Sequence, residues 1–301
     1  MIIGSHVSYG KEGLFTSVKE AVSYGANTFM FYTGAPTNTI RKDIDLEYTK
    51  LAKELMIKNN IDINNVICHA PYIINPATFD LEKQKFAISF LIQELKRCFQ
   101  LGIKYIVLHP GSSVGITKEE GLNNIIYVLK EVLKENIPVT ILIETMAGKG
   151  SERGIDISEL SYIIDNLDSK YIGVCLDTCH LHDSGVDLTN FDFYLDLFSE
   201  KIGLDKIKCI HLNDSKNELG SHKDRHANIG FGHIGFSTLI SIVNNERLNG
   251  IPLILETPYI GDYDDDKNRL YPPYKYEISM IKSGKFNPDL LNLIRLEYKK
   301  Q

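Results

Sequence analysis

Six apolar segments of the chain each end on a residue of a type that binds metal ions. The terminal residues are separated by 40, 35, 33, 34 and 45 positions, and they are His69, His109, Glu144, Asp177, His211 and Glu256. Each interval has room for roughly one helix and one strand. A parallel barrel brings the C-terminal ends of its strands into one ring, and active sites lie on that face. The spacing therefore predicts a compact cluster of imidazole and carboxylate groups.

The apolar runs before these residues, together with two earlier runs, give eight candidate strands. The earlier runs are residues 1–7 and 27–32, and all eight are rich in Ile, Val and Leu without strict alternation, as in strands covered on both faces. Helical patterns lie between them, and Thr117 with Glu120 forms a capping box that starts one helix. Eight strand–helix repeats predict an α/β fold, a (β/α)8 TIM barrel with its active site at the C-terminal face of the strands. A doubly wound open sheet fits less well, because it would spread six strand ends over about 25 Å at about 4.8 Å per strand.

The whole chain, residues 1–301, is expected to form a single barrel domain. A length of 301 residues and a hydrophobic content of 43% are sufficient for one large core. Residues from roughly 260 to 301 are expected to form a C-terminal extension that packs on the barrel. The long interval between His211 and Glu256 holds a polar insertion rich in glycine and charge, which predicts a loop over the barrel mouth.

Composition indicates a soluble, cytoplasmic protein without a membrane partner. The N-terminus lacks the pattern of a signal peptide, and no apolar run approaches the ~18 residues of a membrane span. The five scattered cysteines predict buried thiols in a reducing compartment. A net charge of −6, taken alone, counts against a nucleic-acid partner. Divalent cations bound at the strand ends would nevertheless make the barrel mouth locally positive.

Three further candidate ligands lie outside the regular spacing. His180 follows Asp177 in what is expected to be a loop, and Asp224 and His226 are two residues apart in the polar insertion. In an extended segment the latter two side chains point to the same side. Nine ligands are too many for one ion and fit two or three. The mixture of imidazole and carboxylate favours zinc, manganese or iron over calcium or magnesium.

Three segments resemble, in order, the signatures of the endonuclease IV family, the family 2 apurinic/apyrimidinic (AP) endonucleases of DNA base-excision repair. They are residues 174–180, residues 211–216, and residues 224–226 followed by 229–235. Segments around His109, Glu144 and Glu256 match as well, so the resemblance covers roughly residues 1–285. It implies hydrolysis of the phosphodiester 5′ to an abasic site in double-stranded DNA. The products would carry a 3′-hydroxyl and a 5′-deoxyribose phosphate.

The resemblance also implies a trinuclear zinc site, with Mn²⁺ or Fe²⁺ as alternatives at one or more positions. The three predicted ligand sets are His69, His109 and Glu144; Glu144, Asp177, His211 and Glu256; and His180, Asp224 and His226. Glu144 would be catalytic as the bridge between two ions, and Glu256 would be catalytic by orienting the attacking nucleophile. The resemblance further implies a monomer.

Two loop residues are candidates for DNA contact. Tyr72, in the loop of residues 69–75, matches the family's tyrosine that is pushed into the DNA stack. The segment after the second strand, residues 32–41, is rich in Thr and Asn and departs from the family's DNA-penetrating pattern. Arg41 is the candidate that remains there.

The residues leave two other function classes open. A metal-dependent sugar isomerase or epimerase on the same barrel would also place Glu, Asp and His at strand ends, but it does not need the third ligand set. A non-catalytic DNA- or metal-binding protein would not require so complete an open metal site. A count of bound metal and an assay with an abasic duplex discriminate among the three.

Overall fold

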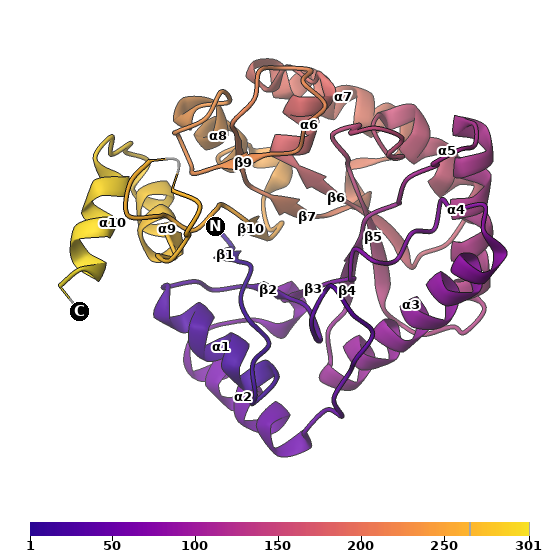
Figure 1. Ribbon diagram of the computed structural model, residues 1–301, viewed down its shortest axis with the longest axis horizontal. Helices are drawn as coiled ribbons and strands as arrows, with labels where there is room; N and C mark the ends of the chain where they lie inside the picture. Colours follow the sequence, from indigo (N-terminus) through magenta and orange to yellow (C-terminus); the bar gives the residue numbers. More distant parts are fainter. Residues whose placement is uncertain (265, 301) are drawn as a thin grey trace.

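Eight parallel strands form the central sheet of the computed structural model, which describes residues 1–264 and 266–300 (Figure 1). Their order in the sheet is β1-β10-β7-β6-β5-β4-β3-β2. The strands are β1 (Ile3–Ser5), β2 (Met30–Phe31), β3 (Ile67–His69), β4 (Tyr105–Leu108), β5 (Thr140–Glu144), β6 (Ile172–Asp177), β7 (Ile207–His211) and β10 (Leu253–Leu255). Asp265 and Gln301, which belong to the predicted domain, lie outside the described residues.

The sheet curves until its two edge strands meet. His6 and Met30 form a parallel bridge, and the Val7 amide donates to the Met30 carbonyl at 2.8 Å. The eight predicted strands are all present, so the prediction of a (β/α)8 barrel is confirmed. The open-sheet alternative is wrong, because the β1 and β2 edges are not separated.

Helices cover the outside of the strands in alternation along the chain (Figure 1). They are α1 (Leu14–Ser23), α2 (Leu46–Lys58), α3 (Leu81–Leu101), α4 (Lys118–Leu133), α5 (Ile157–Leu167), α7 (Phe191–Lys201) and α8 (Phe236–Val243). Helix α4 begins at the predicted capping box. The Thr117 hydroxyl accepts from the Glu120 amide at 3.2 Å, and the Glu120 carboxylate accepts from the Thr117 amide at 2.8 Å.

Two predictions about the barrel mouth need correction. His180 lies on a short helix, α6 (Thr178–Ser184), and not in a loop, because the Asp177 carboxylate caps that helix by accepting from the His180 amide at 2.8 Å. The polar insertion is not only a loop. It contains an antiparallel ribbon of β8 (Asp214–Ser215) and β9 (His226–Ala227), in which Ser215 pairs with His226.

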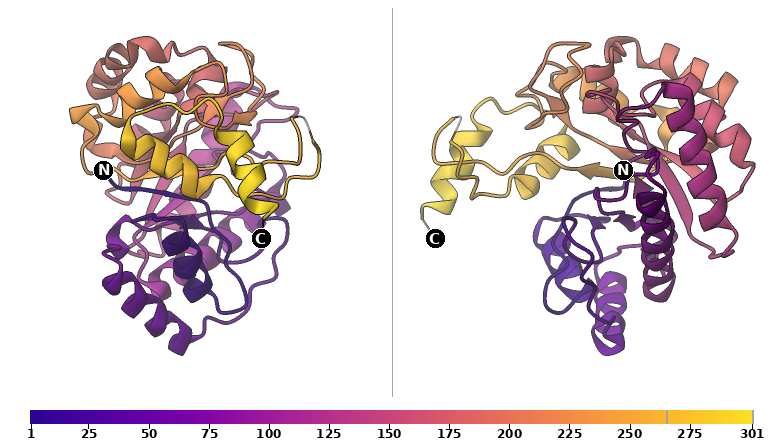
Figure 2. Two further views of the ribbon diagram at one scale, coloured as in Figure 1. Left: turned by 90° about the vertical axis from the view of Figure 1, so that its left-hand side faces the viewer. Right: turned by 45° about the vertical axis from the view of Figure 1, so that its right-hand side comes forward.

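The C-terminal extension carries two helices, α9 (Tyr274–Ser283) and α10 (Leu290–Tyr298). Helix α9 contacts β1, and the two C-terminal helices lie to one side of the barrel (Figure 2). The fully buried Glu277 of α9 accepts hydrogen bonds from the Ile229 amide at 3.0 Å and the Asn228 side chain at 3.1 Å. The extension is therefore joined to the segment that follows β9. Within the described residues no helix has both the length and the apolar character needed to cross a membrane.

The capping box makes a stability prediction. Thr117→Ala removes the hydroxyl that satisfies the Glu120 amide, so the free energy of unfolding should fall by about 1 kcal/mol. Urea unfolding monitored by circular dichroism measures the change. Thr117→Ser is the matched control, because it retains the hydroxyl and should lie close to the wild type. Equal losses in both variants would contradict the capping role.

Candidate metal centre

The alternation of side chains along each strand places the six strand-end residues inside the barrel. The interior of the barrel is filled by a layer that includes Ile67, Val107, Leu142, Cys175, Cys209 and Ile254. Each of the six residues lies two positions after a member of this layer. Because side chains two apart in a strand face the same side, all six point into the barrel immediately above the apolar layer.

Glu144 lies at the centre of the cluster and is fully buried. Its Oε2 atom lies 3.0 Å from His109 Nε2 and 3.3 Å from His69 Nε2. Its Oε1 atom lies 3.0 Å from His211 Nδ1 and 3.4 Å from His180 Nδ1. The two oxygens of one carboxylate therefore face different groups of imidazoles, which is the arrangement that a bridging ligand requires.

The second predicted set surrounds His211. Its Nδ1 atom lies 3.2 Å from Glu256 Oε2 and 3.7 Å from Asp177 Oδ2. Asn213, to which the sequence analysis assigned no role, connects these two carboxylate residues. Its side-chain amide donates to Asp177 Oδ2 at 2.8 Å, and its oxygen accepts from the Glu256 amide at 2.9 Å. The sequence signals for Asn213 are its position two residues after a strand-end histidine and its place in the signature segment of residues 211–216.

The third predicted set comes from α6, the β8–β9 connection and β9. Asp224 Oδ1 lies 3.0 Å from His180 Nε2 and 3.5 Å from His226 Nε2. His226 Nε2 also lies 3.7 Å from Asp177 Oδ2, so this set adjoins the second. All nine predicted ligands thus come together. In each predicted set, one candidate ligand atom per residue lies within 4.8 Å of the others.

The imidazoles are oriented as metal ligands usually are. The Nδ1 atoms of three histidines hydrogen-bond to backbone carbonyls and leave Nε2 for a ligand: His69 to Ala70 at 2.7 Å, His180 to Thr145 at 2.8 Å and His226 to Glu256 at 3.2 Å. A carbonyl on one ring nitrogen fixes the tautomer and directs the other nitrogen to the metal. His226 Nε2 is buried and has no hydrogen-bond partner among the described residues. The residues therefore fit bound metal ions.

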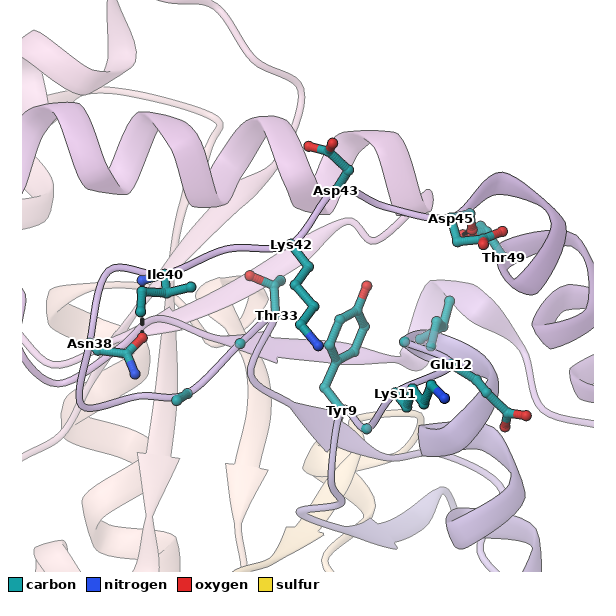
Figure 3. Close-up of a pocket in the computed structure, with 15 residues that line it drawn as sticks. Tyr9, Lys11, Glu12, Thr33, Asn38, Ile40, Lys42, Asp43, Asp45 and Thr49 are labelled. Carbon is teal, nitrogen blue, oxygen red and sulfur yellow. Dashed lines mark hydrogen bonds between the residues drawn. The ribbon is translucent and has the colours of Figure 1, made fainter.

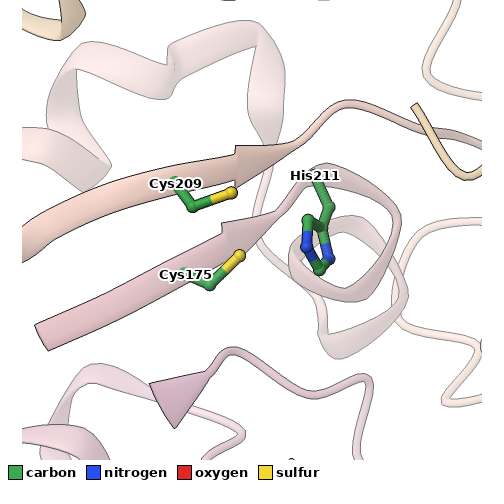
Figure 4. A group of neighbouring side chains, drawn as sticks. All are labelled: Cys175, Cys209 and His211. Atoms are coloured by element: carbon green, nitrogen blue, oxygen red, sulfur yellow. The ribbon is translucent and has the colours of Figure 1, made fainter. Parts of the chain in front are cut away.

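Below the cluster, two cysteines lie close to His211 (Figure 4). Cys175 and Cys209 are partners on the neighbouring strands β6 and β7. Their sulfur atoms and one His211 ring nitrogen lie within 4.8 Å of one another. All five cysteines, which lie in the described part of the chain, are buried free thiols, as the sequence predicted.

Burial and charge set the protonation of the imidazoles. Burial lowers the pKa of His69, which favours the neutral form that binds metal. Burial also acts to lower the pKa of His180 and of His211. The carboxylates around them, led by Asp177 at His180 and by Glu256 at His211, together outweigh burial and raise these two pKa values well above the ordinary range. Metal binding at His180 and His211 therefore has to displace protons, and it should weaken as the solution becomes acidic.

Two larger cavities and one small cavity lie near the barrel mouth. One of about 630 Å³ is lined by His6, Tyr32 and Glu256, so it reaches the metal centre. The other, of about 550 Å³, lies between the segments that follow β1 and β2 (Figure 3). Its lining includes Lys11 and Lys42, and none of the nine described ligands belongs to it. The first cavity therefore exposes Glu256 to solvent.

The two candidate DNA contacts lie in different environments. Tyr72 is 52% exposed and shares the lining of a small cavity with His109. The Arg41 side chain is only 1% exposed, and its Nε donates to Glu94 Oε1 at 2.6 Å. Its guanidinium also lies 4.9 Å from the centre of the Phe90 ring. Arg41 therefore braces the segment after β2 from within. Its contact with DNA stays a prediction.

Comparison with known proteins identifies the family. A family model described as a xylose isomerase-like TIM barrel matches residues 18–282. The chain is 49% identical to the probable endonuclease 4 of Listeria welshimeri, over 97% of this chain and 98% of the relative. It is 50% identical to the probable endonuclease 4 of Oceanobacillus iheyensis, over 96% of this chain and 97% of that one.

Solved structures agree with these relatives. Endonuclease IV from Thermus thermophilus superposes with a TM-score of 0.78 at 26% identity, over 94% of this chain and 98% of that chain. A D-tagatose 3-epimerase-like protein superposes with a TM-score of 0.67 at 18% identity, over 99% of this chain and 100% of that chain, which shows the shared fold alone. The match to the family model and the identity across nearly the whole chain show that this protein belongs to the endonuclease 4 family, as the signature segments predicted.

Proposed function

We propose that this protein is a metal-dependent AP endonuclease that cleaves double-stranded DNA 5′ to an abasic site, giving a 3′-hydroxyl and a 5′-deoxyribose phosphate. As a member of the endonuclease 4 family it is a hydrolase of DNA phosphodiester bonds. The observation that carries the metal dependence is the group of nine ligands around the buried Glu144. The alternatives of a sugar epimerase and of a non-catalytic binding protein are not retained.

The proposed cofactor is three zinc ions per chain, with Mn²⁺ or Fe²⁺ as alternatives. Imidazole and carboxylate ligands suit these ions. The three sets of the metal centre would each hold one ion, with Glu144 shared by the first two because its oxygens face different imidazoles. When bound, such ions lower the pKa of a water and neutralise charge on the phosphate.

The chain's own residues orient the nucleophile. The Glu256 side chain is 18% exposed and lines the cavity of about 630 Å³, so its carboxylate can accept a hydrogen bond from a water in that cavity. His6 Nδ1 lies 3.5 Å from Glu256 Oε1, and the Asn213 side chain accepts from the Glu256 amide. These contacts hold Glu256 between solvent and His211, where it can direct a water toward the phosphorus and receive its proton.

Substrate selection would be largely geometric. An abasic nucleotide lacks base stacking, so less free energy is needed to turn it out of the helix than for an intact nucleotide. The exposed Tyr72, next to the His109 loop, is placed to enter the gap in the stack. The proposal includes a monomeric enzyme that acts on cellular DNA in the cytoplasm.

A duplex with one abasic site tests the activity directly. The metal-loaded protein should produce one cut 5′ to the abasic site, with a 3′-hydroxyl that a DNA polymerase extends without further treatment. Gel electrophoresis of an end-labelled strand measures the cut. The same duplex with an intact base at that position is the control and should stay uncut. Protein that retains its metal and leaves the abasic strand intact would overturn the proposed function.

Glu144→Ala tests the shared ligand. The substitution removes both oxygens around which two ligand sets are organised, so at least two ions and nearly all incision activity should be lost. Elemental analysis counts the ions, and the wild type should carry three. Glu119→Ala, on the exposed surface of α4, is the control and should carry the wild-type number. Fewer than two ions per chain in gently purified wild type would reject the proposed three-ion centre. A Glu144→Ala variant with full incision activity would reject the role of Glu144 as a ligand shared by two ions.

Tyr72→Ala tests whether Tyr72 enters the DNA stack at the abasic site. Loss of one aromatic stacking contact is worth about 1–3 kcal/mol, so KM for the abasic duplex should rise by roughly 5- to 150-fold with a smaller change in kcat. Steady-state incision kinetics measure both constants. Tyr127→Ala is a matched control, because Tyr127 is 51% exposed but lies on α4. A KM equal to that of the control would remove Tyr72 from the DNA interface.

A further inference from the structure

Asp183 is a fully buried carboxylate beside the third ligand set, and it is not one of the nine ligands. It lies on α6, three residues after His180. Residues three apart on a helix face the same side. Helix α6 therefore presents on one side both His180, a proposed metal ligand, and Asp183, a carboxylate outside the ligand sets.

Both oxygens of Asp183 bind the segment that carries Asp224. Its Oδ1 accepts from the Ser215 hydroxyl at 2.6 Å. Its Oδ2 accepts from the Asn217 side-chain amide at 2.9 Å and from the Asp224 backbone amide at 2.9 Å. The carboxylate thus reaches the start of this segment and also the ligand residue itself.

The backbone around Asp224 needs such contacts to keep its conformation. His222 and Asp224 have φ angles of 55° and 54°, in the left-handed region that L residues seldom adopt. The Asp183 carbonyl accepts from the His222 amide at 2.9 Å, and the His182 carbonyl accepts from the Gly220 amide at 3.0 Å. Helix α6 therefore holds the segment by both backbone and side-chain hydrogen bonds.

The result is a direct connection between Asp183 and the third ligand set. The backbone of Asp224 is bound to Asp183, and its carboxylate Oδ1 lies 3.0 Å from His180 Nε2. The ligands of the first and second sets, in contrast, come from the ends of the barrel strands β3, β4, β5, β6, β7 and β10. A change at Asp183 should therefore affect the third set while leaving the first two intact.

We propose that Asp183 is a positioning residue for the third metal ion, which it serves by holding Asp224 against His180 and His226. This inference rests on the proposed three-ion centre. Contacts that orient metal ligands typically change metal affinity by about 10- to 100-fold. Asp183→Ala should lower the affinity for the third ion by that factor and leave two ions tightly bound.

Asp183→Asn separates hydrogen-bond geometry from charge. With its oxygen turned toward Asn217 and Asp224, the amide keeps both acceptor contacts of Oδ2, and its NH₂ group can donate to the Ser215 hydroxyl. This variant should retain the third ion far better than Asp183→Ala. Asp187→Ala is the matched control on the neighbouring turn, because Asp187 is exposed and its side chain binds only Thr189 among the described hydrogen bonds.

The experiment uses the full-length holoprotein equilibrated in buffers of decreasing free zinc. Zinc per chain is counted by elemental analysis, and incision of the abasic duplex is followed as zinc is added back. Asp183→Ala should fall to two ions where the wild type keeps three, and its kcat should recover as free zinc rises. Recovery with zinc alone could also follow from a folding defect, because metal binding stabilises the folded state. The urea midpoint of the metal-free variant reports on folding separately.

Four results would overturn the inference: wild-type affinity for the third ion in Asp183→Ala, loss of all three ions together, incision that added zinc does not restore, or an Asn variant as defective as Ala. If Asp183→Ala does not fold, Asn217→Ala removes one donor to Oδ2 and should weaken the third ion less strongly. Unchanged affinity there would contradict the proposal.

A wild type that binds three ions without cutting the abasic duplex would instead reject the proposed function, and the zinc counts would still test Asp183.

Discussion

The burial of Glu144 is the constraint on which the rest of the site depends. A carboxylate without solvent is costly to ionise unless opposite charges surround it. Burial acts to raise the pKa of Glu144, but the imidazoles of His211 and His109 outweigh it and hold the pKa well below the ordinary range. The barrel is thus built around an anion that requires cationic partners on both of its oxygens. Metal ions at two of the proposed sets meet that requirement directly, since each oxygen already faces separate imidazoles.

Strand geometry explains why so much could be predicted from the sequence. The fold and six ligand positions follow from local patterns, namely an apolar run, its last residue and a repeated interval. For example, Leu142 fills the barrel interior and Glu144, two residues later, faces the same side. That relation holds within a few consecutive residues and needs no knowledge of distant contacts.

Long-range contacts between loops explain what could not be predicted. Arg41 forms its buried ion pair with Glu94, which lies 53 residues away, and the segment around Arg41 alone does not indicate this partner. Asp183 and Asp224 are 41 residues apart, and neither segment alone indicates that they meet. His180 was expected in a loop, because a seven-residue helix capped by Asp177 has too short a pattern to recognise. These features depend on side chains from separate elements that only the folded chain brings together.

The ligand sets of the metal centre are held in two different ways, so they should differ in rigidity. The ligands of the first two sets lie at the ends of barrel strands. In the third set, Asp224 and His226 lie in the polar insertion, which buried carboxylates hold in place. Asp214 accepts from the amides of Gly232 and Ile234 at 3.0 and 2.9 Å, and a Cβ at Gly232 would lie 2.4 Å from that carboxylate. Such a segment depends on contacts between loops, whereas the strand ends are held by the hydrogen bonds of the sheet. We therefore expect the proposed third ion to exchange with solvent before the other two, because the position of its ligand Asp224 depends on the contact with Asp183.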